Sequence, residues 1–221
     1  MLARFTGAIA LLSAAVPWTP ARAAPVDVAL VLAMDVSLSV DEGEYHLQRE
    51  GVARAFESPA LAAAVANGKY HAIDVLVLEW SDPEIQVSTV PWTRVTDAHS
   101  AEAFAAKLRA TQRSSHGLTA IGAAMRAGAA AFDHMPEPAA HKVIDVSGDG
   151  MANVGPQPSG VRDTLTAEGV TINGLTILSR SNRLNSFGSL QNFVVPSVQA
   201  FNERAVEYVC GYCIIGKADV D

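Results

Sequence analysis

Four apolar runs of strand length, separated by helical patterns, constrain the fold of this chain more than any other feature of its sequence. The runs are VDVALVLAM (26–34), AIDVLVLEW (72–80), HKVIDVS (141–147) and VTINGLTIL (170–178). Strands that are apolar along their length, rather than at alternate positions, are typical of a sheet covered on both faces. The pattern therefore predicts an α/β fold with a mostly parallel sheet.

Helical patterns fill the intervals between these runs. They cover residues 41–59, 100–111, 119–135 and 159–169. The first begins with Asp41, and Glu44 follows three residues later, which is the spacing of a capping box. The last ends at Gly169, a residue type that commonly terminates helices. These end signals support the division of the chain into alternating strands and helices.

One further segment, IQVSTVPW (85–92), alternates apolar and polar residues and contains a proline. Proline cannot donate a ladder hydrogen bond, so we expect an edge strand beside residues 72–80. Because parallel strands are joined by right-handed crossovers, the order of elements predicts a doubly wound sheet with helices on both faces. In such sheets, binding sites lie outside the carboxyl ends of the strands.

The first 23 residues have the composition of a secretory signal peptide. A basic start (MLAR) precedes an apolar core (FTGAIALLSAAVPW) and the small-residue sequence ARA, which predicts cleavage after Ala23. The apolar core is short for a membrane span, although an uncleaved anchor is the alternative. We therefore expect an exported protein, periplasmic or secreted, with residues 24–221 forming one domain without a membrane span.

The charge balance excludes two classes of partner. The chain has 16 basic and 23 acidic residues, and the predicted leader contains two arginines and no acid, which leaves 14 basic against 23 acidic residues, or −9. A surface this acidic, without a cluster of lysine or arginine, is unsuited to nucleic acid or to an anionic membrane.

Oxygen-bearing side chains gather at the predicted strand ends. Asp35, Ser37 and Ser39 follow the first apolar run, Asp149 lies in the turn SGDG after the third, and Thr119 opens the alanine-rich helical segment. If the backbone stays extended past the strand, the first three side chains point the same way. An all-oxygen set suits a hard divalent ion, first Mg²⁺ and then Mn²⁺ or Ca²⁺.

Each motif also has a purely structural interpretation. DVSLS can be a helix cap or a turn between strand and helix, and SGDG alone indicates only a turn. The joint occurrence of the motifs, in order and at strand ends of one α/β pattern, favours a metal site. Asp145 lies inside a predicted buried strand, so it is expected to meet a polar partner.

The motifs DVSLS (35–39), LTAIG (118–122) and DVSGDG (145–150) together resemble the metal-ion-dependent adhesion site (MIDAS) of von Willebrand factor type A domains. Within these domains the chain is similar to an uncharacterised family of secreted bacterial proteins. The resemblance covers about residues 26–178, and the tail, 179–221, departs from it. It implies a Rossmann-like sheet with one short antiparallel edge strand, at residues 85–92.

The resemblance also implies a role for the five residues and a function. Asp35, Ser37, Ser39 and Thr119 correspond to ligand positions, and Asp149 to a ligand or to a partner of a metal-bound water. Such domains usually bind proteins through the metal and are not enzymes. The implied partner is a protein that offers an acidic side chain to the bound ion.

Two enzymatic alternatives remain open. CGYC places Cys210 and Cys213 in the spacing of a thiol–disulfide exchanger, but the βαβ context of thioredoxin-like proteins is missing. A metal-assisted hydrolase could use the Asp35 site. Phosphatases with an aspartate nucleophile need a second acid two residues later, and here that position is Ser37. No catalytic residue is therefore assigned.

Overall fold

The computed structural model describes residues 24–177 of the 221-residue chain. The predicted signal peptide, the tail and the pair Cys210 and Cys213 lie outside the described residues. Among the helices of the described part, none combines the length and apolarity that crossing a membrane requires.

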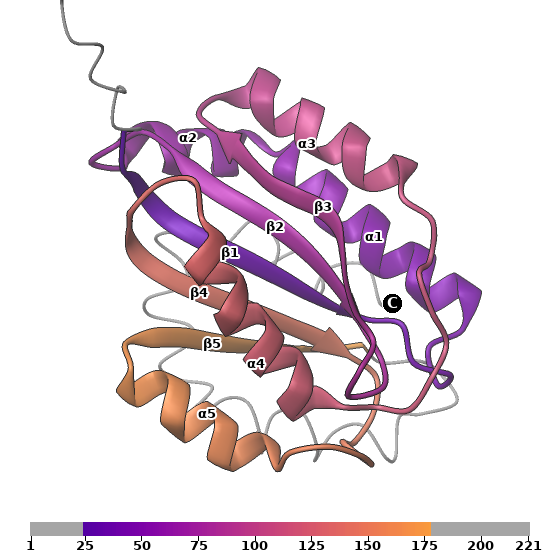
Figure 1. Ribbon diagram of the computed structural model, residues 1–221. Helices are drawn as coiled ribbons and strands as arrows, with labels where there is room; N and C mark the ends of the chain where they lie inside the picture. Colours follow the sequence, from indigo (N-terminus) through magenta and orange to yellow (C-terminus); the bar gives the residue numbers. More distant parts are fainter. Residues whose placement is uncertain (1–23, 178–221) are drawn as a thin grey trace, which may run out of the picture.

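Five strands form one sheet in the order β3-β2-β1-β4-β5. Their bounds are Val26–Asp35 (β1), Ile73–Trp80 (β2), Gln86–Val95 (β3), Ala139–Gly148 (β4) and Val170–Thr176 (β5). All neighbours are parallel except β3, which pairs with β2 in the antiparallel direction at the edge (Figure 1). The predicted mostly parallel sheet is thus confirmed, and its antiparallel edge strand has ten residues, the same length as β1.

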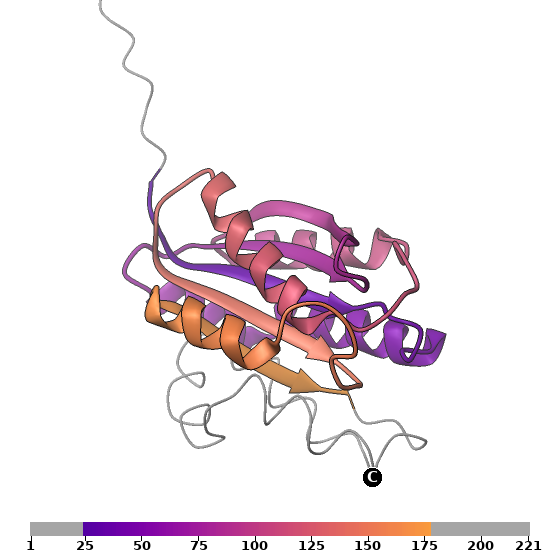
Figure 2. The same cartoon turned by 60° about the horizontal axis from the view of Figure 1, so that its bottom comes forward.

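Helices cover both faces of the sheet, as predicted. They are Glu42–Phe56 (α1), Pro59–Asn67 (α2), Ala98–Ala110 (α3), Ile121–Ala131 (α4) and Pro158–Ala167 (α5). Figure 2 shows α4 and α5 in front of the sheet, with α1 and α3 behind it. The predicted capping box of Asp41 and Glu44 is present at the start of α1.

The helix bounds differ from the expected ranges by a few residues, and two differences change the description of the fold. Helix α2 was not predicted, although Ser58 caps its first turn and Pro59 occupies its first position, a common start signal. The alanine-rich helix begins at Ile121, so Thr119 lies in the preceding loop rather than opening the helix. This difference matters because a loop residue can approach the strand ends more freely than a helical one.

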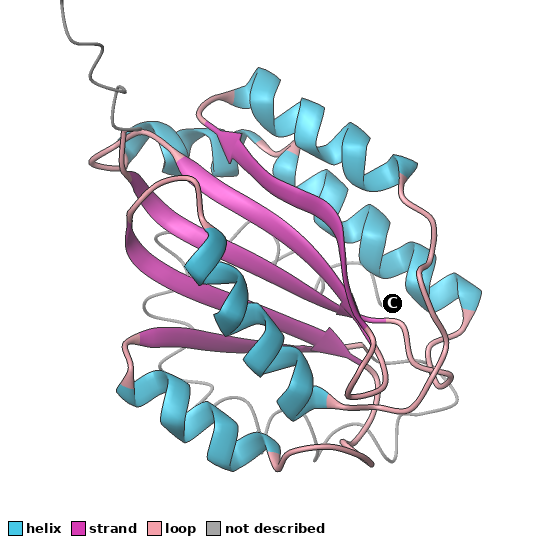
Figure 3. Ribbon diagram, in the orientation of Figure 1, coloured by secondary structure: helices cyan, strands magenta, loops and turns pink. Residues whose placement is uncertain are grey.

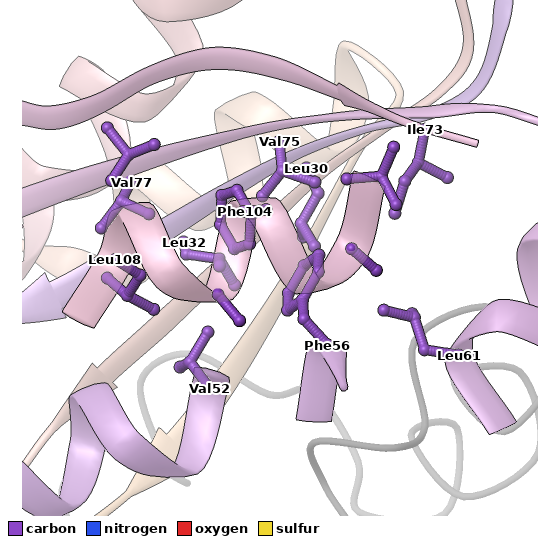
Figure 4. Close-up of a cluster of buried hydrophobic side chains, with 14 of the residues drawn as sticks. Leu30, Leu32, Val52, Phe56, Leu61, Ile73, Val75, Val77, Phe104 and Leu108 are labelled. Atoms are coloured by element: carbon purple, nitrogen blue, oxygen red, sulfur yellow. The ribbon is translucent and has the colours of Figure 1, made fainter. Parts of the chain in front are cut away.

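Strand β1 separates two hydrophobic cores. Its side chains alternate between the faces, so Leu30 and Leu32 belong to one cluster and Val31 to the other. In the first cluster the sheet packs against Phe56 of α1 and Phe104 of α3, whose ring centroids are 4.3 Å apart (Figure 4). Burial on both faces explains why the strand is apolar from Val28 to Met34.

The sheet order determines where a site can form. The chain leaves β1 toward β2 on one side and later returns to place β4 on the other side of β1. The crossovers therefore diverge from the carboxyl ends of β1 and β4, where such sheets form a crevice. Figure 3 shows the loops after these two strands at the same end of the sheet.

Asp145 of β4 is buried and accepts a hydrogen bond of 2.7 Å from the side-chain amide of Asn173 on β5, so the expected polar partner is confirmed. Burial raises the pKa of this carboxyl from 3.8 to about 6, against the smaller opposing effect of Asn173. The stability that the protonated carboxyl contributes is complete below pH 3.8 and is lost as the pH rises through about 6.

The variant Asp145→Asn should not lose stability as the pH rises, because its neutral amide cannot ionise and keeps the contact with Asn173. We expect its free energy of unfolding to exceed that of the wild type by about 1–3 kcal/mol at pH 8 and to match it near pH 4. Urea denaturation at the two pH values measures the difference. Asp133→Asn, at an exposed position, is the matched control and should show no such pH-dependent gain.

Candidate metal centre

The loop after β1 turns immediately, so the condition under which Asp35, Ser37 and Ser39 would point the same way, an extended backbone, is not met. The amide of Ser37 donates to Oδ1 of Asp35 at 2.8 Å, and the amide of Val40 donates to the carbonyl oxygen of Ser37 at 3.1 Å. Val36 and Val40 are buried with Tyr45 in a small cluster that anchors both ends of the turn. The turn, rather than the pleat of a strand, determines where Ser37 and Ser39 point.

All five predicted residues nevertheless come together at the carboxyl ends of β1 and β4. Ser37 Oγ and Ser39 Oγ are 3.1 Å apart, and Ser39 Oγ donates to Oδ1 of Asp149 at 2.7 Å. Thr119 Oγ1 donates to Ser37 Oγ at 3.3 Å. Asp35, Ser37, Thr119 and Asp149 are buried, whereas Ser39 is exposed. The cluster therefore reaches the molecular surface at Ser39.

Thr119 is held in this cluster by its backbone. Its amide donates to Oδ1 of Asn153 at 2.9 Å, and its carbonyl accepts from the amide of Asn153 at 3.0 Å. The start of α4 packs so closely on the same loop that a Cβ at Gly122 would lie 2.2 Å from the carbonyl oxygen of Pro156. Sequence analysis did not identify Asn153, because an asparagine in a glycine-rich loop indicates only a turn.

Asp35 is the most strongly perturbed of the five residues. It is fully buried, and its Oδ2 atom has no hydrogen-bond partner among the described residues. Burial raises the pKa of this carboxyl to about 7; the hydrogen bonds from Ser37 oppose the shift, and the nearby Asp149 adds to it. Within the described chain, Ser37 and Arg113 therefore compensate an ionised Asp35 only in part, which is a situation that a bound cation relieves.

The donor set fits a hard divalent cation. Neighbouring ligands of an octahedral Mg²⁺ ion, each about 2.1 Å from it, lie about 3 Å apart. The oxygen–oxygen distances within the cluster, 2.7, 3.1 and 3.3 Å, have this size. Residues 24–177 contain no group of three or more His, Cys, Asp and Glu side chains placed to hold a metal. In this candidate centre the hydroxyl groups of serine and threonine supply three of the five oxygen-bearing side chains.

Arg113 is a second residue that sequence analysis missed. Its Nη2 atom donates to the carbonyl oxygens of Val36, Ser37 and Val40, at 3.0, 2.8 and 2.9 Å. The side chain is only 7% exposed, and its Nε donates to the carbonyl of Ser115 at 3.1 Å. Arg113 thus joins the turn after β1 to the loop that carries Thr119. Its partners are backbone atoms, which no sequence motif reveals.

A buried pair, Tyr45 and Glu79, packs next to the Arg113 guanidinium. Tyr45 donates through its hydroxyl to Oε1 of Glu79 at 2.7 Å, and Oε2 of Glu79 accepts from the amide of Ser114 at 2.8 Å. Burial, and then the Glu79 carboxylate, raise the pKa of Tyr45 to about 12, so the phenol remains a donor at neutral pH. The Arg113 guanidinium lies 5.5 Å from the centroid of the Tyr45 ring. The hydrogen bond from Ser114 to Glu79 therefore fixes the position of the residue that follows Arg113 in the loop.

Gln48 of α1 links the two strands that carry the acids. Its Nε2 donates to the carbonyl oxygen of Asp35 at 3.2 Å, and its Oε1 accepts from Ser147 Oγ at 2.8 Å. Ser147 lies two residues before Asp149 on β4. The buried amide therefore fixes the end of β1 relative to the end of β4.

Comparison with known proteins agrees with this architecture. The family model described as Protein of unknown function (DUF1194) matches residues 25–208. No curated protein matches the chain significantly. Among solved structures, proximal thread matrix protein 1 from the mussel byssus is similar, with 14% identity over 83% of this chain and 46% of that chain, at a TM-score of 0.54.

A second structure of the mussel protein has a zinc-occupied MIDAS motif and matches with 17% identity over 82% of this chain and 45% of that chain, at a TM-score of 0.50. The chain thus spans less than half the length of these proteins. At this identity the likeness shows the fold alone, and the fold is von Willebrand factor A-like, as the motifs predicted.

Proposed function

We propose that this chain, which belongs to the family described as Protein of unknown function (DUF1194), is an exported domain that binds a protein partner through a divalent cation, in the first place Mg²⁺. The observation that carries the proposal is the cluster of Asp35, Ser37, Ser39, Thr119 and Asp149, joined by contacts of 2.7–3.3 Å. The zinc-occupied motif of the mussel protein supports a divalent ion at such a cluster.

The composition of the cluster favours a partner carboxylate. A bound cation supplies a positive centre that accepts an oxygen ligand. Three of the five side chains are hydroxyls and bring no negative charge, so the two carboxylates can at most balance the double charge of the ion and leave no excess negative charge to repel a further carboxylate. Because Ser39 is exposed, a ligand from another molecule can approach from its side. An acidic side chain is the protein ligand that best matches a hard ion whose charge the site does not exceed.

A binding role accounts for the site better than catalysis. An aspartate nucleophile of the phosphatase type needs a second acid two residues later. That position is Ser37, which is buried and within hydrogen-bonding distance of Ser39 and Thr119. Cys210 and Cys213 lie outside the described residues, so the proposal does not draw on them. We therefore infer a non-enzymatic domain.

Calorimetric titration with Mg²⁺, Mn²⁺ and Ca²⁺ tests the proposal at its first step. We expect one ion per wild-type chain, and an affinity at least about tenfold lower for Ser39→Ala, because the variant lacks one oxygen donor. Ser39 is exposed, so this truncation leaves the core intact. Absence of ion binding by the wild type would contradict the proposal.

Retention of a protein from the exported fraction tests the second step. Immobilised wild type is expected to retain a partner in Mg²⁺ and to release it in a chelator, while Ser39→Ala retains less. Glutarate in the Mg²⁺ buffer should compete for the partner, because it offers a free carboxylate. Retention that is indifferent to both the chelator and glutarate would rule out a metal-mediated contact.

A further inference from the structure

Large exposed apolar side chains occur in each of the loops that form the candidate metal centre. Among the described residues, the exposed large hydrophobic side chains are Leu38, Leu47, Val87, Leu118 and Met151. Three of these five lie in the loops that carry the metal-site residues. Leu38 lies between Ser37 and Ser39, Leu118 precedes Thr119, and Met151 is two residues after Asp149. Each of the three loops contributes one of them.

Hydrogen bonds between the loops place these side chains around one centre. The amide of Leu38 donates to the carbonyl of Gly117 at 2.8 Å, which brings Leu38 next to the residue before Leu118. The loop that contains Met151 lies against Ser39, because a Cβ at Gly150 would be 3.8 Å from Ser39 Oγ. The same loop is tied to Thr119 through Asn153.

The exposure of these residues is not explained by the core. Leu38 is 72% exposed, Leu118 48% and Met151 61%, so most of each side chain lies in water. Val36 and Val40 on either side of the Leu38 position are buried and anchor the turn, so the turn does not depend on a leucine between them. Single exposed hydrophobic residues are common, but a group of them around a polar site is typical of an interaction surface.

We propose that Leu38, Leu118 and Met151 form an apolar rim that recognises the side chains next to the partner's acidic residue. This inference rests on the proposed function. The occupant is an acidic peptide segment in which apolar residues flank the carboxylate on both sides in sequence. The bound ion selects the carboxylate oxygen, and the rim removes the neighbouring apolar side chains from water. The flexible side chain of Met151 can adapt to different apolar neighbours.

A displayed peptide library tests the rim. Its members carry a fixed central glutamate with three random residues on each side, and binders are selected in Mg²⁺ and eluted with a chelator. We expect the wild type to enrich leucine, isoleucine, methionine and phenylalanine next to the glutamate. Peptides with a fixed glutamine in place of the glutamate should not be retained.

Serine variants connect the enrichment to the three residues. For a selected peptide labelled with a fluorophore, Leu38→Ser, Leu118→Ser and Met151→Ser should each weaken binding about three- to tenfold. The triple variant should lose the preference for apolar neighbours. Leu47→Ser is the matched control, because Leu47 is 64% exposed but lies on α1, and its affinity should equal that of the wild type.

The outcomes separate the rim from the proposed function. Calorimetry should show unchanged Mg²⁺ binding in the serine variants, which supports an effect on the partner rather than on the ion. Selection of Mg²⁺-dependent peptides without apolar neighbours overturns the rim alone. No retention of any peptide although Mg²⁺ binds overturns the rim and the carboxylate-binding step of the proposed function, and leaves the metal site standing. A wild type that binds no divalent ion overturns the proposed function and the rim with it.

Discussion

Replacement of Asp35 by asparagine is expected to abolish divalent-cation binding while raising the stability of the metal-free protein. Asp35 is fully buried, its Oδ2 has no hydrogen-bond partner among the described residues, and Asp149 is a second acid nearby. An amide of the same shape removes the charge that attracts a cation. It also removes the free-energy cost of burying that charge when no cation is bound.

We expect the Mg²⁺ affinity of Asp35→Asn to fall by more than about 100-fold, since loss of a ligand exceeds the 10–100-fold effect of a residue that only supports one. The free energy of unfolding in a chelator should rise by about 2 kcal/mol. Calorimetry and urea denaturation measure the two effects.

A loss of Mg²⁺ affinity together with a gain in the stability of the metal-free protein is the result that a metal ligand predicts. If Asp35 only stabilised the fold, its replacement would lower the free energy of unfolding of the protein both with and without Mg²⁺. Asp133→Asn neutralises an exposed acid outside the three loops, and it should change neither quantity appreciably. Unchanged Mg²⁺ binding in Asp35→Asn would contradict the assignment of this residue as a ligand.

Truncation of Arg113 to alanine should cause the largest loss of stability of any substitution considered. The side chain satisfies the carbonyl oxygens of Val36, Ser37 and Val40, and it lies over the ring of Tyr45. Its removal leaves three carbonyl groups without this donor. We expect a loss of about 3–5 kcal/mol, or a melting temperature lower by roughly 6–20 °C.

Two further variants identify the cause of that loss. Arg109→Ala removes a guanidinium that pairs with Glu50 and Glu57 but is 34% exposed, so it should cost no more than about 1 kcal/mol. Arg113→Lys keeps the positive charge but cannot reproduce the planar fork, so it should recover little of the stability.

Mg²⁺ titration then shows whether the turn must be held for the ion to bind. Both Arg113 variants should bind Mg²⁺ more weakly than the wild type does. The alanine variant also removes a positive charge that by itself disfavours cations, so weaker binding there identifies geometry as the dominant effect. Equal losses of stability in Arg113→Ala and Arg109→Ala would show that the buried carbonyl contacts contribute nothing special.

Much of the fold was predictable because its signals are local. The apolar runs identified four parallel strands, and the proline of the alternating segment placed β3 at the edge of the sheet. The capping box at Asp41 and the positive φ of Gly169 mark helix ends that short-range rules describe. Helix α2 was missed although its start signal was present, because Pro59 was interpreted as the end of the preceding helix rather than as the first residue of a new one.

The site was only partly predictable, for reasons that Ser37 and Arg113 illustrate. The sequence motifs identified the five oxygen-bearing residues, but they did not predict the turn at Ser37 that brings the hydroxyl groups together. Arg113 contacts carbonyl oxygens, which every residue type possesses, so its partners leave no trace in the sequence. Asn153 likewise acts through the backbone of Thr119.

By itself, the sequence of this protein determined which segments form the strands and all helices but α2, and which side chains can offer oxygen ligands, because both depend on residue type and short spacing. Only the tertiary structure decided that β4 lies next to β1, so that Asp149 meets Ser39 across 110 positions of the chain. It also decided that Leu38, Leu118 and Met151 lie around one centre. Such contacts depend on strand order and loop closure, which are properties of the whole packed sheet rather than of any segment.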